Sequence, residues 1–262
     1  MTNEDRFIPV LRKDIRLEPI IYEEGNYILF EDPLVPDGEP TAVNPEMYMF
    51  VNSAGGTMTF SELRTFLGSE GAPVDSIDSV IEFIEYLENK GYMENEVYYE
   101  RLAQYNAITE REMICAGSSY PQDPVAFKQF MNELFNLADN KPNYIPKALI
   151  APHIDLLLGE LSQKIYANAY NSIKDVDADL FVVFGTSHII NSNFFMLTER
   201  DYKTPLGAIE TDKELIAELN DTASKYFRID SVAHDLEHSV EYQAVMLKYL
   251  FENKNVKVLP IL

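Results

Sequence analysis

The residues best suited to chemistry in this chain are its histidines. All four lie in the second half of the sequence, at His153, His188, His234 and His238. Imidazole is the commonest transition-metal ligand and the one side chain that titrates near neutral pH without perturbation. The clustering therefore predicts a metal or acid–base site and assigns that site to the second half of the chain.

Two of these histidines come directly after short apolar runs. His153 follows the run 148–151, and His188 follows the run 180–184 and a Gly-Thr-Ser turn. Ligands in open α/β sheets bind at the carboxyl ends of the strands. If both runs are strands, both histidines lie at that edge, which favours a functional role over that of a lone structural histidine.

The other two histidines belong to one segment with helical spacing. His234 and His238 are four residues apart, so a helix would place them on one face. The spacing is similar to the His-Glu-x-x-His motif of zinc peptidases, but Glu237 directly precedes the second histidine, so that motif is not matched. Such a helix could aim one or both rings into a cleft, or it could present a solvated face.

The types of candidate ligand limit which metal ions could bind, but they do not select one. Histidine and carboxylate ligands with no thiolate suit iron, zinc, copper or manganese, and two histidines with one carboxylate would form the facial triad of non-haem iron oxygenases. Asp155 could ligate a cation, orient an imidazole or cap the next helix. The single cysteine, Cys115, excludes an internal disulfide and a multi-cysteine zinc site.

The elements around these residues alternate between apolar and helical segments. Besides the two runs already described, apolar runs occur at 194–197 and 256–262, and helical periodicity occurs at 157–169 and again after Asp212. Continuous apolar strands separated by helices predict an α/β domain whose sheet has helices on both faces.

Residues 1–110 follow a different pattern, that of a small α+β domain. Segments 20–22 and 27–30 flank a polar turn and predict a hairpin. Thr59 and Glu62 have capping-box spacing at the start of a helix that Gly68 can stop, and a second helix can run from Asp75 to Gly91. A hairpin with two short helices indicates a winged-helix-like module. Because the second helix is acidic, we expect docking or peptide binding and not DNA recognition.

The net charge and the absence of targeting signals in the sequence limit the partners and the cellular location that we expect. The net charge is −22 and the isoelectric point is about 4.4, so the chain repels nucleic acids and anionic membranes, and we expect neither as a partner. No stretch approaches the ~18–20 apolar residues of a membrane span. The acidic N-terminus lacks the order of a signal peptide. We therefore expect a cytoplasmic protein.

Taken in order, the segments of the second half resemble the Memo-like family, in its long prokaryotic form called protein B of the AmmeMemoRadiSam system. The resemblance covers about 112–262, and the additional N-terminal module is consistent with the longer form. The segments that carry it are Ala116–Pro124, Pro152–Asp155, Gly185–His188, Thr204–Gly207, Glu237–Gln243 and Pro260–Leu262.

This resemblance implies a fold like that of class III extradiol dioxygenases, with a metal-binding pocket at the strand ends. Carried over to this sequence, it implies that His153, His188 and His238 are the metal ligands. It also implies that His238 has a catalytic role, with His234 and Asp235 as catalytic neighbours.

The end of the chain bears on this ligand set. In shorter members of the family, a cysteine beyond the final strand completes the metal site. This sequence stops at Leu262 within that strand, and Cys115 does not match that cysteine. Either the Memo-like domain, residues 111–262, is truncated at its C-terminus, as the resemblance implies, or its metal site is completed by other residues.

Two functions follow from these observations. The first is a non-haem metal-dependent oxidoreductase, similar to a dioxygenase, with a divalent Fe, Cu or Zn ion on the histidines and a further histidine as acid–base group. The second is a non-catalytic binding or scaffold protein that docks a small molecule, a peptide or the radical-SAM component of the system. The histidine set favours the first, and the shortened end and the acidic module favour the second.

Overall fold

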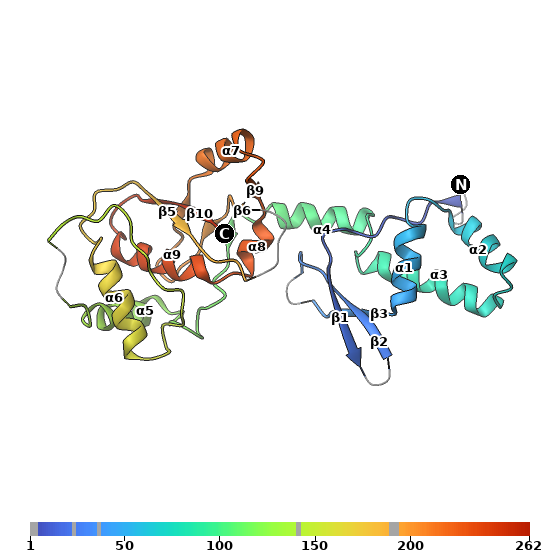
Figure 1. The fold of residues 1–262 in the computed structure, drawn as a ribbon, viewed down its shortest axis with the longest axis horizontal. Helices are drawn as coiled ribbons and strands as arrows, with labels where there is room; N and C mark the ends of the chain where they lie inside the picture. The colour runs from blue at the N-terminus through green and yellow to red at the C-terminus, as the bar shows by residue number, and fades with distance from the viewer. Residues whose placement is uncertain (1–4, 23–24, 36–37, 140–142, 189–193) are drawn as a thin grey trace. The chain divides into compact units, whose positions relative to one another are not determined.

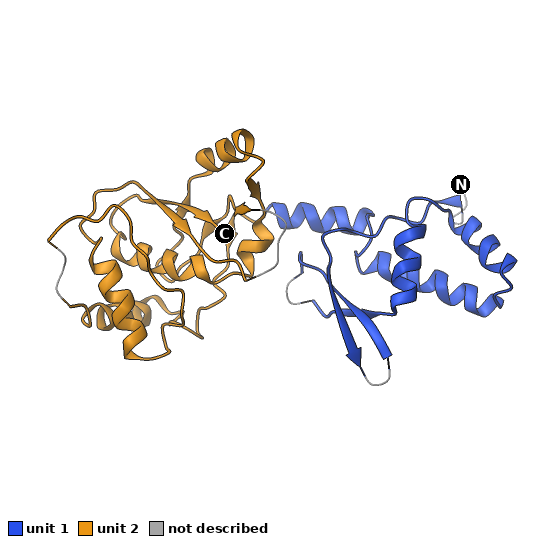
Figure 2. Cartoon of the chain, viewed as in Figure 1, with its two compact units in different colours: residues 1–107 blue, residues 108–262 orange. Residues whose placement is uncertain are grey.

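The chain divides into two compact units. The computed structural model describes residues 5–22, 25–35, 38–139, 143–188 and 194–262. The division falls between Ala107 and Ile108, whereas the sequence predicted a boundary at about 110 (Figure 2). Each unit has a hydrophobic core of its own. None of the described helices has both the length and the apolar character needed to cross a membrane.

Unit 1, residues 1–107, begins with a three-stranded antiparallel sheet. Its strands are β1 (Arg16–Tyr22), β2 (Gly25–Glu31) and β3 (Thr41–Val43). The register pairs Arg16 with Glu31 and Tyr22 with Gly25, so the predicted hairpin is confirmed. Residues 23–24 of its predicted turn lie outside the described residues.

Helices form the rest of unit 1. They are α1 (Pro45–Ala54), α2 (Phe60–Ser69), α3 (Val74–Asn89) and α4 (Glu96–Asn106). Thr59 and Glu62 form the predicted capping box. The prediction that Gly68 stops α2 is wrong, because an exposed glycine costs a helix only about 1 kcal/mol and the helix continues through it. The second predicted helix begins at Val74, one residue before Asp75.

Unit 2, residues 108–262, is built on a five-stranded sheet. Its path is β5 (Leu180–Phe184), β10 (Lys257–Ile261), β6 (Phe195–Leu197) and β9 (Phe227–Ile229), and β8 (Glu210–Thr211) also pairs with β10. β10 runs parallel to β5 and antiparallel to β6. A second sheet pairs β4 (Glu110–Arg111) with β7 (Asp201–Tyr202). The mixed α/β class is therefore confirmed.

Helices lie on both sides of β10. Unit 2 contains α5 (Pro124–Phe135), α6 (Glu160–Asn171), α7 (Lys213–Thr222), α8 (Ser231–Asp235) and α9 (Ser239–Leu250). Val258 belongs to the core that contains α9, whereas Leu259 and Ile261 pack with Ile216 of α7. Successive strand residues point to opposite faces. α7 therefore covers one face of β10 and α9 covers the other (Figure 1).

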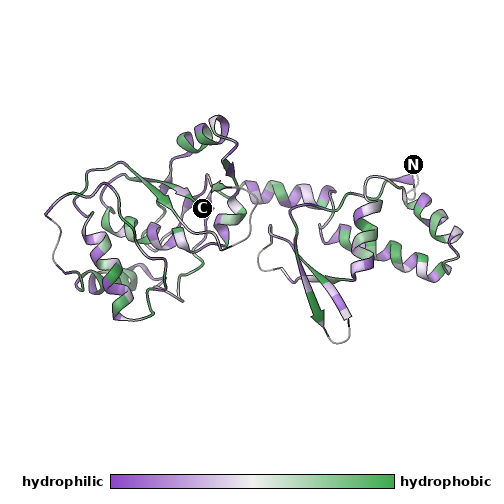
Figure 3. Cartoon of the chain, viewed as in Figure 1, coloured by the Kyte–Doolittle hydropathy of each residue, from purple (hydrophilic) through white to green (hydrophobic). Residues whose placement is uncertain are grey.

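The first predicted strand of unit 2 does not form. Residues 148–151 have no strand assignment, and Ile150 is fully exposed. An apolar run is a strand only where a neighbour pairs with it, and no pairing of this run is found within the described residues. β5 departs from the predicted double cover as well, because Val182 and Phe184 are 52% and 66% exposed. Figure 3 shows hydrophobic and hydrophilic residues alternating along the helices of both units.

The prediction that His234 and His238 share a helix face is wrong. α8 ends at Asp235, and α9 begins at Ser239. The Glu237 carboxylate accepts the backbone N–H groups of His238 at 2.9 Å and Ser239 at 3.1 Å, so it caps the start of α9. The chain therefore turns between the two histidines and separates their surroundings.

Candidate metal centre

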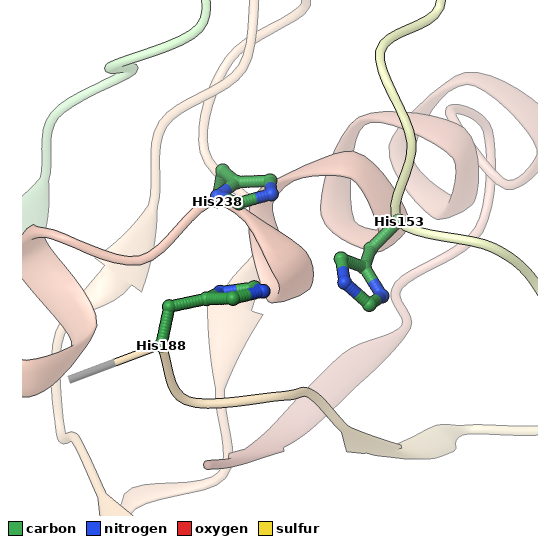
Figure 4. A group of neighbouring side chains, drawn as sticks. All are labelled: His153, His188 and His238. Carbon is green, nitrogen blue, oxygen red and sulfur yellow. The ribbon is translucent and has the colours of Figure 1, made fainter. Parts of the chain in front are cut away.

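Three of the four histidines gather at one place in unit 2. His153, His188 and His238 each offer a ring nitrogen, and these three atoms lie within 4.8 Å of one another. The ring centroids are 5.0 Å apart for His188 and His238, 5.2 Å for His153 and His188, and 5.7 Å for His153 and His238. Figure 4 shows the rings facing a common space from three separate segments. The structure thus brings together the three residues predicted as metal ligands.

Loops and a helix start carry these rings. His153 lies in the irregular segment before α6, His188 lies after the end of β5, and His238 is the N-cap residue of α9. The side chains of His188 and His238 are 49% and 36% exposed. A solute can therefore reach the cluster from solvent.

Helix α9 fixes both loops to itself. The Ser239 hydroxyl donates to the Thr186 carbonyl and accepts the Thr186 N–H, both at 3.0 Å. The Gln243 side-chain amide donates to the Pro152 carbonyl at 3.0 Å. Since Thr186 and Pro152 lie within two residues of His188 and His153, one helix sets the positions of all three rings.

Gly185 permits the close approach of strand β5 to α9. A Cβ atom at this position would lie 2.6 Å from both Ser239 Oγ and Val240 Cγ2, and 2.9 Å from Leu262 Cδ2. Real Cβ atoms do not tolerate contacts this short, so a larger residue would push the strand end away from the helix.

A buried carboxylate, Glu237, contacts the cluster through His188. The Glu237 side chain is 2% exposed, and its oxygens lie 2.9 and 3.0 Å from His188 Nδ1 and 2.8 Å from the His188 N–H. Burial alone would raise the pKa of the Glu237 carboxyl. Hydrogen bonds from the backbone and ring of His188 and from the Ser239 N–H outweigh burial and lower that pKa below its ordinary value. Glu237 is therefore an anion at neutral pH.

A second buried carboxylate, Glu241, fixes the segment that precedes α5. It accepts hydrogen bonds from the Cys115 N–H at 2.9 Å and the Tyr120 hydroxyl at 2.5 Å, and it pairs with the buried Arg111. Burial raises the pKa of the Cys115 thiol to about 11, so this thiol stays protonated. The ring centroids of Tyr242 and His238 are 5.5 Å apart, so Tyr242 lies between the histidine cluster and the residues that contact Glu241.

The fourth histidine lies outside the cluster. His234 is fully buried, with Nε2 at 2.9 Å from the Met196 carbonyl and Nδ1 at 2.7 Å from the Tyr202 hydroxyl. Because a carbonyl only accepts, Nε2 carries the proton and Nδ1 accepts from tyrosine. Burial lowers the pKa of His234 to about 4, so the ring is neutral at pH 7. Asp235, its predicted catalytic neighbour, pairs with Arg200 at 2.5 Å.

Comparison with known proteins identifies the family. A sequence model described as Memo-like protein matches residues 111–262, which is more than half of the chain. The chain belongs to the Memo-like family. The resemblance predicted for about 112–262 is therefore confirmed.

The relatives of this Memo-like chain are longer than it is. A MEMO1 family protein of Aquifex aeolicus is 30% identical over 242 residues, which cover 90% of this chain and 62% of the relative. One of Pyrococcus furiosus is 30% identical over 158 residues, covering 58% of this chain and 52% of the relative. One of Nitrosopumilus maritimus is 27% identical over 158 residues. Because the first match takes in 90% of the chain, it extends well into unit 1.

Sequence reasoning about the Memo-like domain missed the residues that hold the ligands. Glu237, Ser239 and Gln243 all lie in a segment that predicted the family, yet their spacing alone gives them no partner. Asp155, a candidate ligand by sequence, accepts the Leu157 N–H at 2.7 Å in a turn and is not among the three clustered residues.

Proposed function

We propose that this Memo-like domain binds one divalent transition-metal ion through His153, His188 and His238 and uses it in a non-haem oxidoreductase reaction similar to that of class III extradiol dioxygenases. The observation that carries the proposal is the meeting of three imidazole nitrogens within 4.8 Å. Neutral imidazoles without a thiolate suit iron, copper or zinc. Family membership supports the fold part of the proposal.

Different residues of the chain would have different roles around that ion. When bound, the metal would supply Lewis-acid or redox chemistry to a substrate oxygen. α9 holds the three imidazoles in place, and the half-exposed ring of His188 leaves one side open to substrate. His238, which was also predicted to be catalytic, is assigned here to the metal. His234 and Asp235 are assigned supporting roles here, because each is already held by hydrogen bonds or an ion pair.

Metal analysis of purified protein tests this proposal. We expect about one equivalent of iron, copper or zinc after anaerobic loading and desalting, with loss of that metal in both His153→Ala and His188→Ala. Asp155→Asn is the matched control, since it removes a nearby carboxylate that the structure leaves out of the cluster. Wild-type protein that retains no metal, or variants that retain all of it, would contradict the proposal.

A second function, docking, is favoured by a pocket on unit 1. This pocket of about 180 Å³ is almost wholly apolar, and its lining residues are Glu46, Met47, Phe50, Leu67 and Val80. Exposed acidic residues such as Asp75 and Glu82 of α3 are part of the same unit. We propose that unit 1, interpreted as a winged-helix-like module, receives an apolar side chain from a basic segment of a protein partner, such as the radical-SAM component of the system.

Calorimetric titration of the full chain with that radical-SAM component tests docking. We expect Leu67→Glu to weaken binding at least tenfold, because it places a charge in the pocket. Leu17→Glu is the control, since Leu17 is exposed on β1 and is not among the lining residues. Equal affinity of both variants and the wild type would exclude this pocket as the docking site.

A further inference from the structure

One buried carboxylate touches two of the three clustered histidines. The Oε2 atom of Glu237 lies 2.8 Å from the His188 N–H nitrogen and 2.9 Å from His188 Nδ1. Its Oε1 atom lies 3.0 Å from His188 Nδ1 and 3.2 Å from His238 Nδ1. Oε1 also accepts the N–H groups that open α9. The contacts to the rings go beyond what capping a helix requires.

We infer that Glu237 is a positioning residue that holds His188 as the Nδ1–H tautomer and so directs its Nε2 lone pair into the cluster. This inference rests on the proposed metal site and assigns Glu237 no contact with the metal. A carboxylate anion only accepts hydrogen bonds, so Nδ1 must carry the proton. The nitrogen left with a lone pair is then Nε2, which is the atom that can bind a metal.

The three histidines differ in how firmly they are held. His188 makes two contacts to the carboxylate through Nδ1, and His238 makes one longer contact through the same atom. For the ring of His153, no hydrogen bond is found among the residues that the structure describes. Loss of the carboxylate should therefore change the state of His188 most, that of His238 less and that of His153 least.

Glu237 is shielded from solvent, although the two rings that it contacts are partly exposed. Its side chain is 2% exposed, whereas those of His188 and His238 are 49% and 36% exposed. Because the carboxylate is buried, water has little access to the atoms that contact the two rings. The tautomer of His188 is therefore set before any ligand arrives.

Two-dimensional long-range ¹H–¹⁵N NMR of the metal-free full chain, labelled with ¹⁵N-histidine, reads the tautomer directly. We expect a single Nδ1–H tautomer for His188 in the wild type. In Glu237→Gln the side-chain amide can donate as well as accept, so we expect a mixture of tautomers. Glu237→Asp keeps a carboxylate and should restore the Nδ1–H form. Asp155→Asn is the control and should leave the spectrum of His188 unchanged.

Zinc titration of the same variants gives the second measurement. Mutation of a carboxylate that supports a metal-ligating histidine typically weakens metal binding 10- to 100-fold. We expect a loss in this range for Glu237→Gln, a smaller loss for Glu237→Asp and none for Asp155→Asn. If Glu237→Gln does not fold, Glu237→Asp carries the test, with the prediction of the wild-type tautomer and an intermediate affinity.

The outcomes separate this inference from the proposed function. A single Nδ1–H tautomer of His188 in Glu237→Gln, with zinc affinity within twofold of the wild type, would overturn the inference and leave the metal site standing. A wild type that binds none of zinc, iron and copper would overturn the proposed function, while the tautomer of His188 in the metal-free variants would still decide the role of Glu237.

Discussion

His234 and His238 stand four residues apart, yet their surroundings are opposite. His234 is fully buried, with both ring nitrogens hydrogen-bonded to Met196 and Tyr202. The His238 side chain is 36% exposed, and its ring shares a space with two other histidines. A continuous helix would have given both rings one environment. The difference shows that the backbone turn between α8 and α9, and not the residue type, separates the buried histidine from the clustered histidine in this segment.

The largest effect is expected from a mutation that removes the buried ion pair between Arg111 and Glu241, next to His234. Arg111 is fully buried, donates to the backbone carbonyls of His234 at 2.9 Å and Glu237 at 2.7 Å, and pairs with Glu241. Glu241→Gln leaves the guanidinium buried without its carboxylate. We expect a loss of about 3–5 kcal/mol in the free energy of unfolding, measured by urea denaturation of metal-free protein.

The matched control for Glu241→Gln is Glu112→Gln. Glu112 pairs with Lys203 but is 71% exposed, and such surface pairs contribute about 0–1 kcal/mol. If Glu241→Gln lowered the free energy of unfolding no more than this control does, the buried ion pair would not stabilise the fold around His234.

A fall in pH should destabilise the folded chain through His234. The pKa of His234 falls from 6.5 to about 4 on folding, so the unfolded chain binds more protons between these values. The stability contributed by neutral His234 is complete above pH 6.5 and is lost as the pH falls towards 4. The loss by pH 4 is about 3 kcal/mol.

Comparison with His234→Gln isolates this contribution. The variant cannot take up the proton, so the difference in unfolding free energy between wild type and variant should shrink by about 3 kcal/mol from pH 7 to pH 4. Urea titrations at each pH measure it. A difference that stays constant across this range would show that His234 is not buried as a neutral ring.

The smallest effect is expected from a mutation next to the histidine cluster, at Gly185. Gly185→Ala forces a Cβ atom against Ser239 and Val240, which should cost about 1–3 kcal/mol of stability and move the loop that carries His188. We expect weaker zinc binding as well. Gly68→Ala is the control, because nothing lies within 4 Å of a Cβ there and alanine favours a helix. Equal zinc affinity in both variants would show that the position of the loop does not limit metal binding.

Much of the fold follows from local sequence signals. The hairpin of unit 1 and the capping box at Thr59 depend on neighbours in sequence, and the structure has both. The run 148–151 and the single helix across 234–238 failed for a different reason. The first needs a pairing partner, and the second is interrupted at Glu237, whose carboxylate also binds the N–H and the ring of His188, 49 residues away.

Some residues of the candidate site could likewise be predicted from the sequence, and others could not. Residue type and position after apolar runs pointed to His153 and His188, and the family resemblance added His238 to complete the predicted ligand set. The residues that hold them act across long distances in sequence: Ser239 is 53 residues from Thr186, and Gln243 is 91 residues from Pro152. Local sequence patterns carry no record of such pairs.

The double attachment to α9 has a kinetic consequence. Because Ser239 and Gln243 join segments 53 and 91 residues away, the cluster can assemble only after these long loops have closed, which is a slow step in folding. The histidines should therefore converge at the stage when α9 docks, and not earlier. A ligand that captures all three would then slow the release of α9 and prolong the lifetime of the folded domain.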